Sequence, residues 1–201
     1  MYKRSGKHTS YIVVLSVALL ISLSINVNAQ TKLIKRNGWY RNAPIEVFDL
    51  KVKDRGVSFN EAFEADADWL KGVSLKIKNN SGKAIVCIYV GVIFRETAPA
   101  PMMHPKFFGH PTNTKIKPAG PPLELKPGEI LTVSLVDEYE GLKRAVEHRR
   151  PVDSVNILEL EITRAYFGDG MMWDLGEIYR PDPDNLGKWI LVEKGVWIPP
   201  V

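Results

Sequence analysis

The chain has 201 residues, of which 45% are apolar, with 27 Lys and Arg against 23 Asp and Glu and a single cysteine. This length suits one domain with its own core, and one cysteine excludes an internal disulfide framework. Residues 1–29 hold three of the basic residues and no acid, which leaves 24 basic against 23 acidic residues in the rest. Such a balanced domain lacks the basic footprint of nucleic-acid-binding proteins, so no nucleic-acid partner is expected.

Residues 1–29 are typical of a signal peptide. A basic start is followed by an apolar run over 11–25, and Val27 and Ala29 occupy the −3 and −1 positions of a cut before Gln30. The apolar run is shorter than the roughly 20 residues that span a bilayer. The sequence therefore predicts an exported protein, periplasmic or extracellular, with an uncleaved membrane anchor as the alternative.

Residues 30–43 are polar and basic, and Gly38 and Pro44 interrupt any periodic pattern. We expect a flexible leader over this segment, followed by one domain over 44–201. The first strand of that domain is predicted over residues 45–52, which read IEVFDLKV.

Residues 73–94 carry the clearest structural signal. Val73, Leu75 and Ile77 alternate with polar residues, which indicates a half-buried strand. The sequence NNSGK follows, with the Asn and Gly residues of a turn, and then a run that is apolar on both faces, as in a central strand. Two such runs predict a β-hairpin. The lone Cys87 is interpreted as a small buried hydrophobic residue.

Residues 97–122 contain seven prolines and are predicted to form a long loop, because proline is poorly suited to a sheet. Long loops on rigid scaffolds often carry binding residues. The candidate binding residues of this loop are Met102, Met103, His104, Phe107, Phe108 and His110. Copper favours Met and His ligands, so a small copper-binding protein is one alternative. Because their spacing matches no metal motif, no metal ligand is assigned.

A strand and a helix are predicted after this loop. The strand lies within residues 125–136, after a Lys-Pro-Gly-Glu turn, and the helix covers 137–150. Asp137 is expected to cap the helix, with Glu140 at capping-box spacing, and Pro151 to end it. The apolar stripe of the helix consists of Tyr139, Leu142, Ala145 and Val146.

Residues 154–179 predict a second hairpin, because Asp169-Gly170 lies between two strand-like runs. A further strand is predicted over 188–192, which read KWILV. The acidic stretch between them, RPDPDNLG, is interpreted as a polar turn and not as a calcium loop, since its prolines interrupt the spacing of calcium ligands.

Many strands, turn residues between them and one short helix predict an all-β antiparallel sandwich. The succession of VSLKIKNNSGKAIVCIYVGVIF, LKPGEILTVSL, a helical crossover and a closing hairpin resembles the immunoglobulin-like domains of exported bacterial proteins, over about residues 44–192. The resemblance implies an immunoglobulin-like β-sandwich with a crossover helix at about 137–150. A fold of this kind does not by itself indicate a function.

The sequence contains no motif that pairs a nucleophile with a base, so no catalytic residue and no cofactor are predicted. We expect a non-enzymatic module that binds another protein or a component of the cell envelope. A carbohydrate-binding module is a further alternative, because aromatic side chains supply large contact areas for sugars. Trp197, in the tail GVWIPPV, is the possible exposed aromatic residue.

Overall fold

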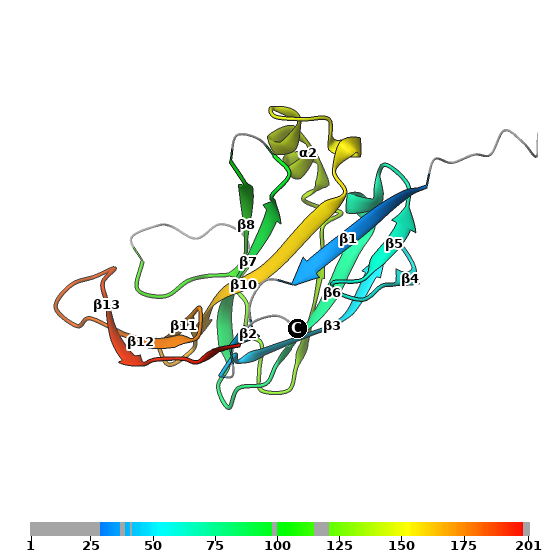
Figure 1. Ribbon diagram of the computed structural model, residues 1–201. Coiled ribbons are helices and arrows are strands. Elements are labelled where there is room, and N and C mark those ends of the chain that lie inside the picture. Colours follow the sequence, from blue (N-terminus) through cyan, green and yellow to red (C-terminus); the bar gives the residue numbers. More distant parts are fainter. Residues whose placement is uncertain (1–28, 37–38, 41, 98–99, 115–120, 199–201) are drawn as a thin grey trace, which may run out of the picture.

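The computed structural model describes residues 29–36, 39–40, 42–97, 100–114 and 121–198, so residues 1–28 of the predicted signal peptide lie outside the described part. Strands predominate over helices in the described chain, and most of them pair antiparallel, which confirms the all-β class (Figure 1). Two large sheets account for nearly all of the strands. A small third pair is formed by β2 (Trp39–Tyr40) and β14 (Trp197–Ile198).

The larger sheet is organised around its long strand β10 (Ile157–Phe167). One side of β10 pairs with β7 (Ile85–Phe94), which pairs in turn with β8 (Met102–Gly109). The other side is shared by two strands, because β1 (Gln30–Arg36) runs parallel to its first half and β11 (Met172–Asp174) antiparallel to its second half. The sheet is completed by β5 (Ala62–Ala65) beside β1, and by β12 (Glu177–Pro181) and β13 (Trp189–Glu193) beyond β11.

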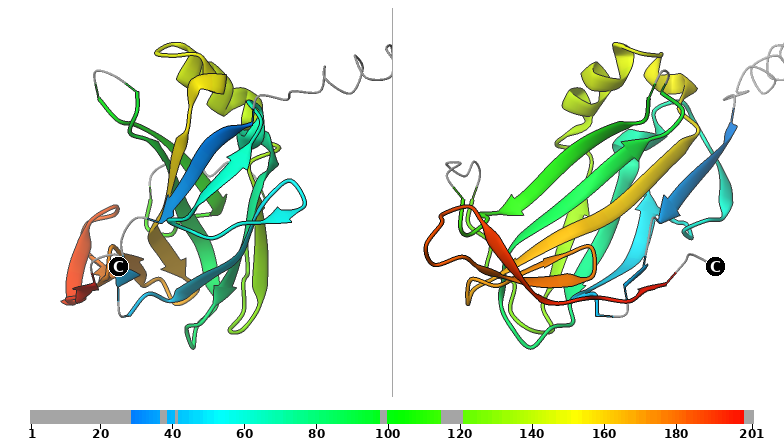
Figure 2. Two further views of the ribbon diagram at one scale, coloured as in Figure 1. Left: turned by 45° about the vertical axis from the view of Figure 1, so that its right-hand side comes forward. Right: turned by 60° about the vertical axis from the view of Figure 1, so that its left-hand side comes forward.

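The smaller sheet has the order β4 (Arg55–Gly56), β3 (Ile45–Val52), β6 (Val73–Asn79) and β9 (Ile130–Ser134). The two sheets lie face to face (Figure 2). They share one hydrophobic core, to which the larger sheet contributes Ile34, Val92 and Leu160 and the smaller sheet Leu75, Ile77 and Val133. The predicted strands at 45–52, 125–136 and 188–192 are confirmed as β3, β9 and β13.

One end of this core is covered by the helix α2 (Tyr139–Glu147) and two short 3-10 turns, η1 (Trp69–Gly72) and η2 (Val152–Ser154). The helix buries Tyr139, Leu142 and Val146, as its apolar stripe predicts. Its cap differs from the prediction: Glu138 and not Asp137 is the N-cap residue, and no side chain caps the first turn. Within the described residues, no helix has the length and apolar character needed to cross a membrane.

The prediction of a hairpin over 73–94 is wrong. Strand β6 pairs with β3 and β9 in the smaller sheet, whereas β7 pairs with β8 and β10 in the larger one. The turn therefore carries the chain from one sheet to the other. Its geometry is held by buried Asn79, whose side-chain amide donates to the carbonyls of Lys83 and Leu125, both at 2.8 Å. The alternation of apolar and polar residues along a strand indicates which face of the strand is buried, but not which strand it pairs with.

The flexible leader predicted over 30–43 is also wrong, because residues 30–36 form β1 inside the larger sheet. Lys32 and Ile34 of this strand are fully buried. The Lys32 ammonium donates to the side chains of Gln30 and Asn156 and to the carbonyl of Val155, at 2.7 to 3.0 Å. Hydrogen bonds of this kind allow a charged side chain to occupy a buried position, which composition alone does not reveal.

The hairpin predicted over 154–179 is confirmed as β10 and β11, with Gly170 at a φ of 87° in the turn. The return run is then divided by a second turn. Leu175 and Gly176 both have positive φ, 46° and 93°. Two consecutive residues of this conformation form the tight turn that suits antiparallel strands, and the chain reverses again into β12.

Candidate functional site

The segment predicted as a Pro-rich loop over 97–122 contains a strand. Residues 102–109 form β8, which pairs with β7 from Met102 opposite Phe94 to Gly109 opposite Cys87. Pro105 lies opposite Gly91 in the middle of this pairing. A proline is tolerated there because β8 is an edge strand, where the missing N–H can face away from the neighbour.

Because β8 is a strand, the candidate binding residues are divided between its two faces. Met103 and Phe107 are about half exposed, at 47% and 48%, whereas Met102 and Phe108 pack against the core. Phe107 makes an edge-to-face contact with Tyr89, with ring centroids 4.5 Å apart.

The two histidines lie at different places in this segment, His104 within β8 and His110 just after its last residue. His104 lies opposite Val92, and the backbone N–H of His110 donates to the carbonyl of Val86. Met103 alternates with Met102 and His104 along the strand, so the two methionines face opposite sides and cannot both bind one copper ion. In the part of the chain that the structure describes, no group of three His, Cys, Asp or Glu side chains could hold a metal ion.

The tryptophans whose side chains the structure describes do not form a platform for a sugar. Trp69 and Trp173 are buried. Trp189 is half-buried and meets Tyr166 at 61°, so their rings do not form a flat platform. The side chain of Trp197 lies outside the described part of the structure, so its predicted exposure stays a prediction.

The C-terminal hairpin of β12 and β13 projects from the side of the two sheets (Figure 1). A second, smaller core anchors it, made of buried Cys87, Tyr166 and Met172 with Tyr179 and Trp189 packed against them. Burial raises the pKa of the Cys87 thiol to about 12, so at neutral pH it is a protonated apolar group and not a nucleophile.

The turn between β12 and β13 is held by several hydrogen bonds. The Asp182 carboxylate accepts hydrogen bonds from the backbone N–H of Asp184 at 2.9 Å and from the Asn185 side chain at 3.0 Å. The Asn113 side chain, which belongs to a distant loop, donates a hydrogen bond to the Lys188 carbonyl and accepts one from the Gly187 N–H. The acidic residues of this stretch therefore shape a turn, in agreement with the interpretation of the sequence.

Strand β13 is an edge strand of the larger sheet. Among the residues that the structure describes, it pairs with β12 alone. Leu191 and Val192 are 40% and 54% exposed although they are consecutive, so apolar side chains project from both faces of the strand. A register shift against β12 falls at Val192 and leaves this residue without an opposite partner.

The backbone of β13 also presents polar groups outward. The Asp182 N–H donates to the Lys188 carbonyl, which makes these two residues a hydrogen-bonded pair. Bonded and non-bonded pairs alternate in an antiparallel ladder, so the next outward-facing residues are Trp189 and Leu191. Trp189 lies opposite Pro181, which has no N–H and so cannot donate a hydrogen bond to it. The edge therefore offers hydrogen-bonding groups beside exposed apolar side chains.

No family model matches the chain, and searches of the curated proteins and of the solved structures gave no significant match.

Proposed function

We propose that this chain is an exported, non-enzymatic interaction module that binds an extended segment of another protein along the free edge of β13. The supporting observation is the combination found at this edge: outward backbone groups at Trp189 and Leu191, and exposed apolar side chains at Leu191 and Val192. An added strand would satisfy the backbone groups by hydrogen bonding and would cover the apolar surface. Natural proteins usually protect such edges, so an unprotected one indicates a partner.

We also propose that the fold is an immunoglobulin-like sandwich. In chain order, β3, β6 and β9 belong to one sheet, while β7, β8, β10 and β11 belong to the other. In the immunoglobulin fold, strands A, B and E share one sheet and strands C, C′, F and G the other, which is the same distribution along the chain. Strand β1, parallel to β10, and the hairpin of β12 and β13 are additions to that plan.

Export is part of the same proposal. The basic, apolar and small-residue regions of 1–29 support it, and so does the position of the predicted cut. Gln30 is the first residue of β1 and is exposed, so cleavage before it would leave the strand complete. Sequencing the N-terminus of protein released from the producing cells tests this point. Gln30 as the first residue is expected, whereas Met1 in membrane-bound material would contradict cleavage.

The binding edge is tested by photo-crosslinking in the producing cells. A photoreactive amino acid replaces Val192 in one variant and Met103 in a control variant, because the two residues have similar exposure, 54% and 47%, on different edge strands. A discrete crosslinked protein is expected from position 192 and not from position 103. Equal crosslinking from both positions, or none from position 192, would contradict the proposal.

A second change separates strand addition from simple hydrophobic contact. Leu191→Pro and Leu191→Ala both remove the exposed Leu191 side chain, but only the proline variant also loses the outward N–H, and the inward ladder to β12 stays in place in both. Crosslinking from position 192 should disappear in the proline variant and persist in the alanine variant, while the thermal unfolding midpoint of each changes little. Persistence of the crosslink in Leu191→Pro, or its equal loss in both variants, would show that backbone pairing is not the mode of binding.

A further inference from the structure

A pocket lies between the two sheets, apart from the edge of β13. Its walls are apolar side chains from both sheets, including Val47 and Ile77 on one side and Leu160 and Ile162 on the other. The space measures about 540 Å³ with its opening to solvent included, and little of it is wide enough for a water molecule. It is therefore a narrow slot, which suits a slender molecule and excludes a bulky one.

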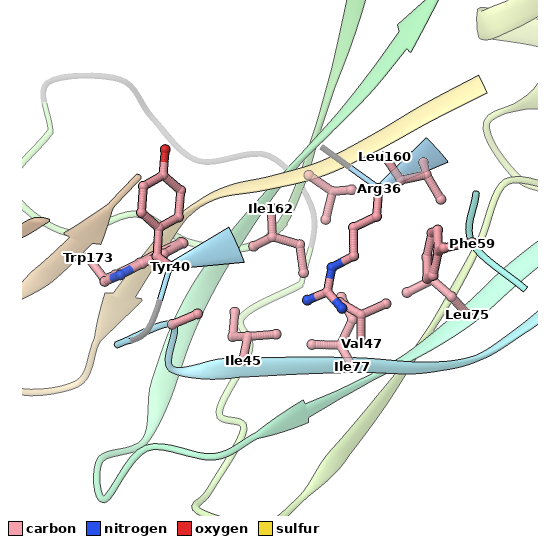
Figure 3. A pocket seen from close by; sticks show the side chains of 12 residues that line it. Arg36, Tyr40, Ile45, Val47, Phe59, Leu75, Ile77, Leu160, Ile162 and Trp173 are labelled. Atoms are coloured by element: carbon pink, nitrogen blue, oxygen red, sulfur yellow. The ribbon is translucent and has the colours of Figure 1, made fainter. Parts of the chain in front are cut away.

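A positive charge stands inside this apolar slot. Arg36, the last residue of β1, points into the space between the sheets, where Figure 3 shows it above Val47 and Ile77. The centre of its guanidinium lies 5.9 Å from the ring of Phe59. Burial lowers the pKa of Arg36 to about 10, partly offset by the carboxylate of Glu46, so the side chain is still charged at neutral pH.

The guanidinium has the chemistry of an anion anchor. It carries five N–H donors in a planar fork, so it can take a carboxylate or a phosphate in addition to the contacts it makes within the protein. Charge-assisted hydrogen bonds of this kind are stronger where the walls are apolar, because water screens them less. Arg36 is half-buried, so the slot reaches the surface beside it.

The far end of the slot holds a second polar group. Trp173 is 2% exposed and packs edge-to-face on Tyr40, with ring centroids 5.8 Å apart. Its indole N–H is buried and has no hydrogen-bond partner among the described residues. Buried donors in native proteins are nearly always paired, so an unpaired donor on a pocket wall is a reason to expect a ligand or an ordered water molecule.

We infer that this pocket binds a slender hydrocarbon chain with an anionic head group, the head held by Arg36 and the chain covered by the walls of both sheets. No residue of β13 lines this pocket, so binding here is independent of the edge. A carboxylate and a phosphate can each accept two parallel hydrogen bonds from a guanidinium, so both head groups belong to the class.

The first test is a ligand series measured by isothermal titration calorimetry with the purified protein. Decanoate and decyl phosphate supply two anionic heads on one chain, decanol a neutral head and decylamine a cationic head. Binding of at least one anion should be tenfold or more tighter than that of decanol, with decylamine weakest. The tighter of the two anions identifies the head group. Equal affinity for all four would overturn the role of Arg36, and absence of binding by all four would overturn the pocket.

The second test uses variants whose thermal unfolding shows them to be folded. Arg36→Gln should weaken the preferred anion at least tenfold, to the level of decanol, and leave decanol unchanged. Ile162→Trp should fill the slot and abolish binding of both, whereas Ile130→Trp, on an exposed residue of β9 that does not line the slot, should abolish neither. Unchanged binding in Ile162→Trp would place the ligand elsewhere. The ligand series decides the charge preference even if Arg36→Gln does not fold.

Discussion

Two of the edge strands of the larger sheet, β8 and β13, differ in design. In β8, Pro105 stands at mid-strand, and Lys106 forms an ion pair with Glu138 at the start of α2. In β13, four consecutive apolar residues, Trp189 to Val192, run along an edge without proline. Proline and charge are the usual means by which a sheet edge is protected from further pairing. The difference indicates that one edge is closed to strand addition and the other is open.

The largest expected effect concerns the direction of the backbone groups in β13. Ile190→Pro removes an inward N–H from the ladder to β12 and leaves a carbonyl unpaired, which should cost about 2 kcal/mol. Leu191→Pro removes an outward N–H and should cost less than about 1 kcal/mol. Urea unfolding followed by tryptophan fluorescence measures both. Equal losses would mean that the assigned ladder is wrong, and with it the open edge.

An effect of similar or smaller size is expected in the core that anchors the β13 hairpin. Cys87 is fully buried with Tyr166 and Met172, so Cys87→Ser places a hydroxyl among apolar groups and should cost about 1 to 3 kcal/mol. Cys87→Ala is the matched control, since it removes volume without adding a polar group. If the serine variant is as stable as the alanine variant, the hairpin is held less firmly than this packing indicates.

A still smaller effect is expected at the closed edge. Lys106→Gln breaks the ion pair with Glu138. In this pair the Lys106 side chain is 25% exposed and the Glu138 side chain 31%. Pairs near the surface contribute about 0.2 to 1 kcal/mol. The unfolding free energy should fall within that range, and β8 should stay closed to partners because Pro105 is unchanged. Strand pairing at β8 in this variant would show that charge and not proline protects the edge.

The smallest expected effect is one of pH on the turn beside β13. The N–H of Asp184 and the Asn185 side chain hold the pKa of the Asp182 carboxyl below its ordinary value of 3.8. A pKa lowered by folding contributes stability above the ordinary value, and this is lost as the pH falls through the folded value. Acidification below about pH 3.8 should therefore weaken the turn. The midpoint of thermal unfolding should drop less with acid in Asp182→Asn than in the natural chain, and equal drops would contradict this role.

The candidate edge could be predicted from the sequence only in part. The run KWILV predicts a strand, and β13 confirms it. The same run, apolar on both faces, is equally typical of a central strand with neighbours on both sides. Whether a strand ends a sheet depends on where distant segments pair, and β13 became an edge because β10 pairs with β11 and β11 with β12.

The residues singled out on 102–110 show the opposite limitation. Their types suggested a cluster, and the prolines suggested a loop. Instead, residues 102–109 pair with the long strand β7 as an edge strand. Because side chains alternate along a strand, Met103 and Phe107 lie on one face and Met102 and Phe108 on the other. Proline content is a weak guide at an edge, where a missing N–H disrupts no pairing.

The sequence by itself determined the all-β class, most strand positions, the helix and the closing turns, because these depend on local periodicity and on residues that tolerate positive φ. The tertiary structure alone decided three other features. It placed the polar segment 30–36 inside a sheet, where Lys32 finds three acceptors. It separated β6 from β7 into different sheets, and it brought Arg36 and Trp173 to one pocket. Each of these features depends on contacts between residues far apart in the chain, and the local sequence pattern does not indicate such contacts.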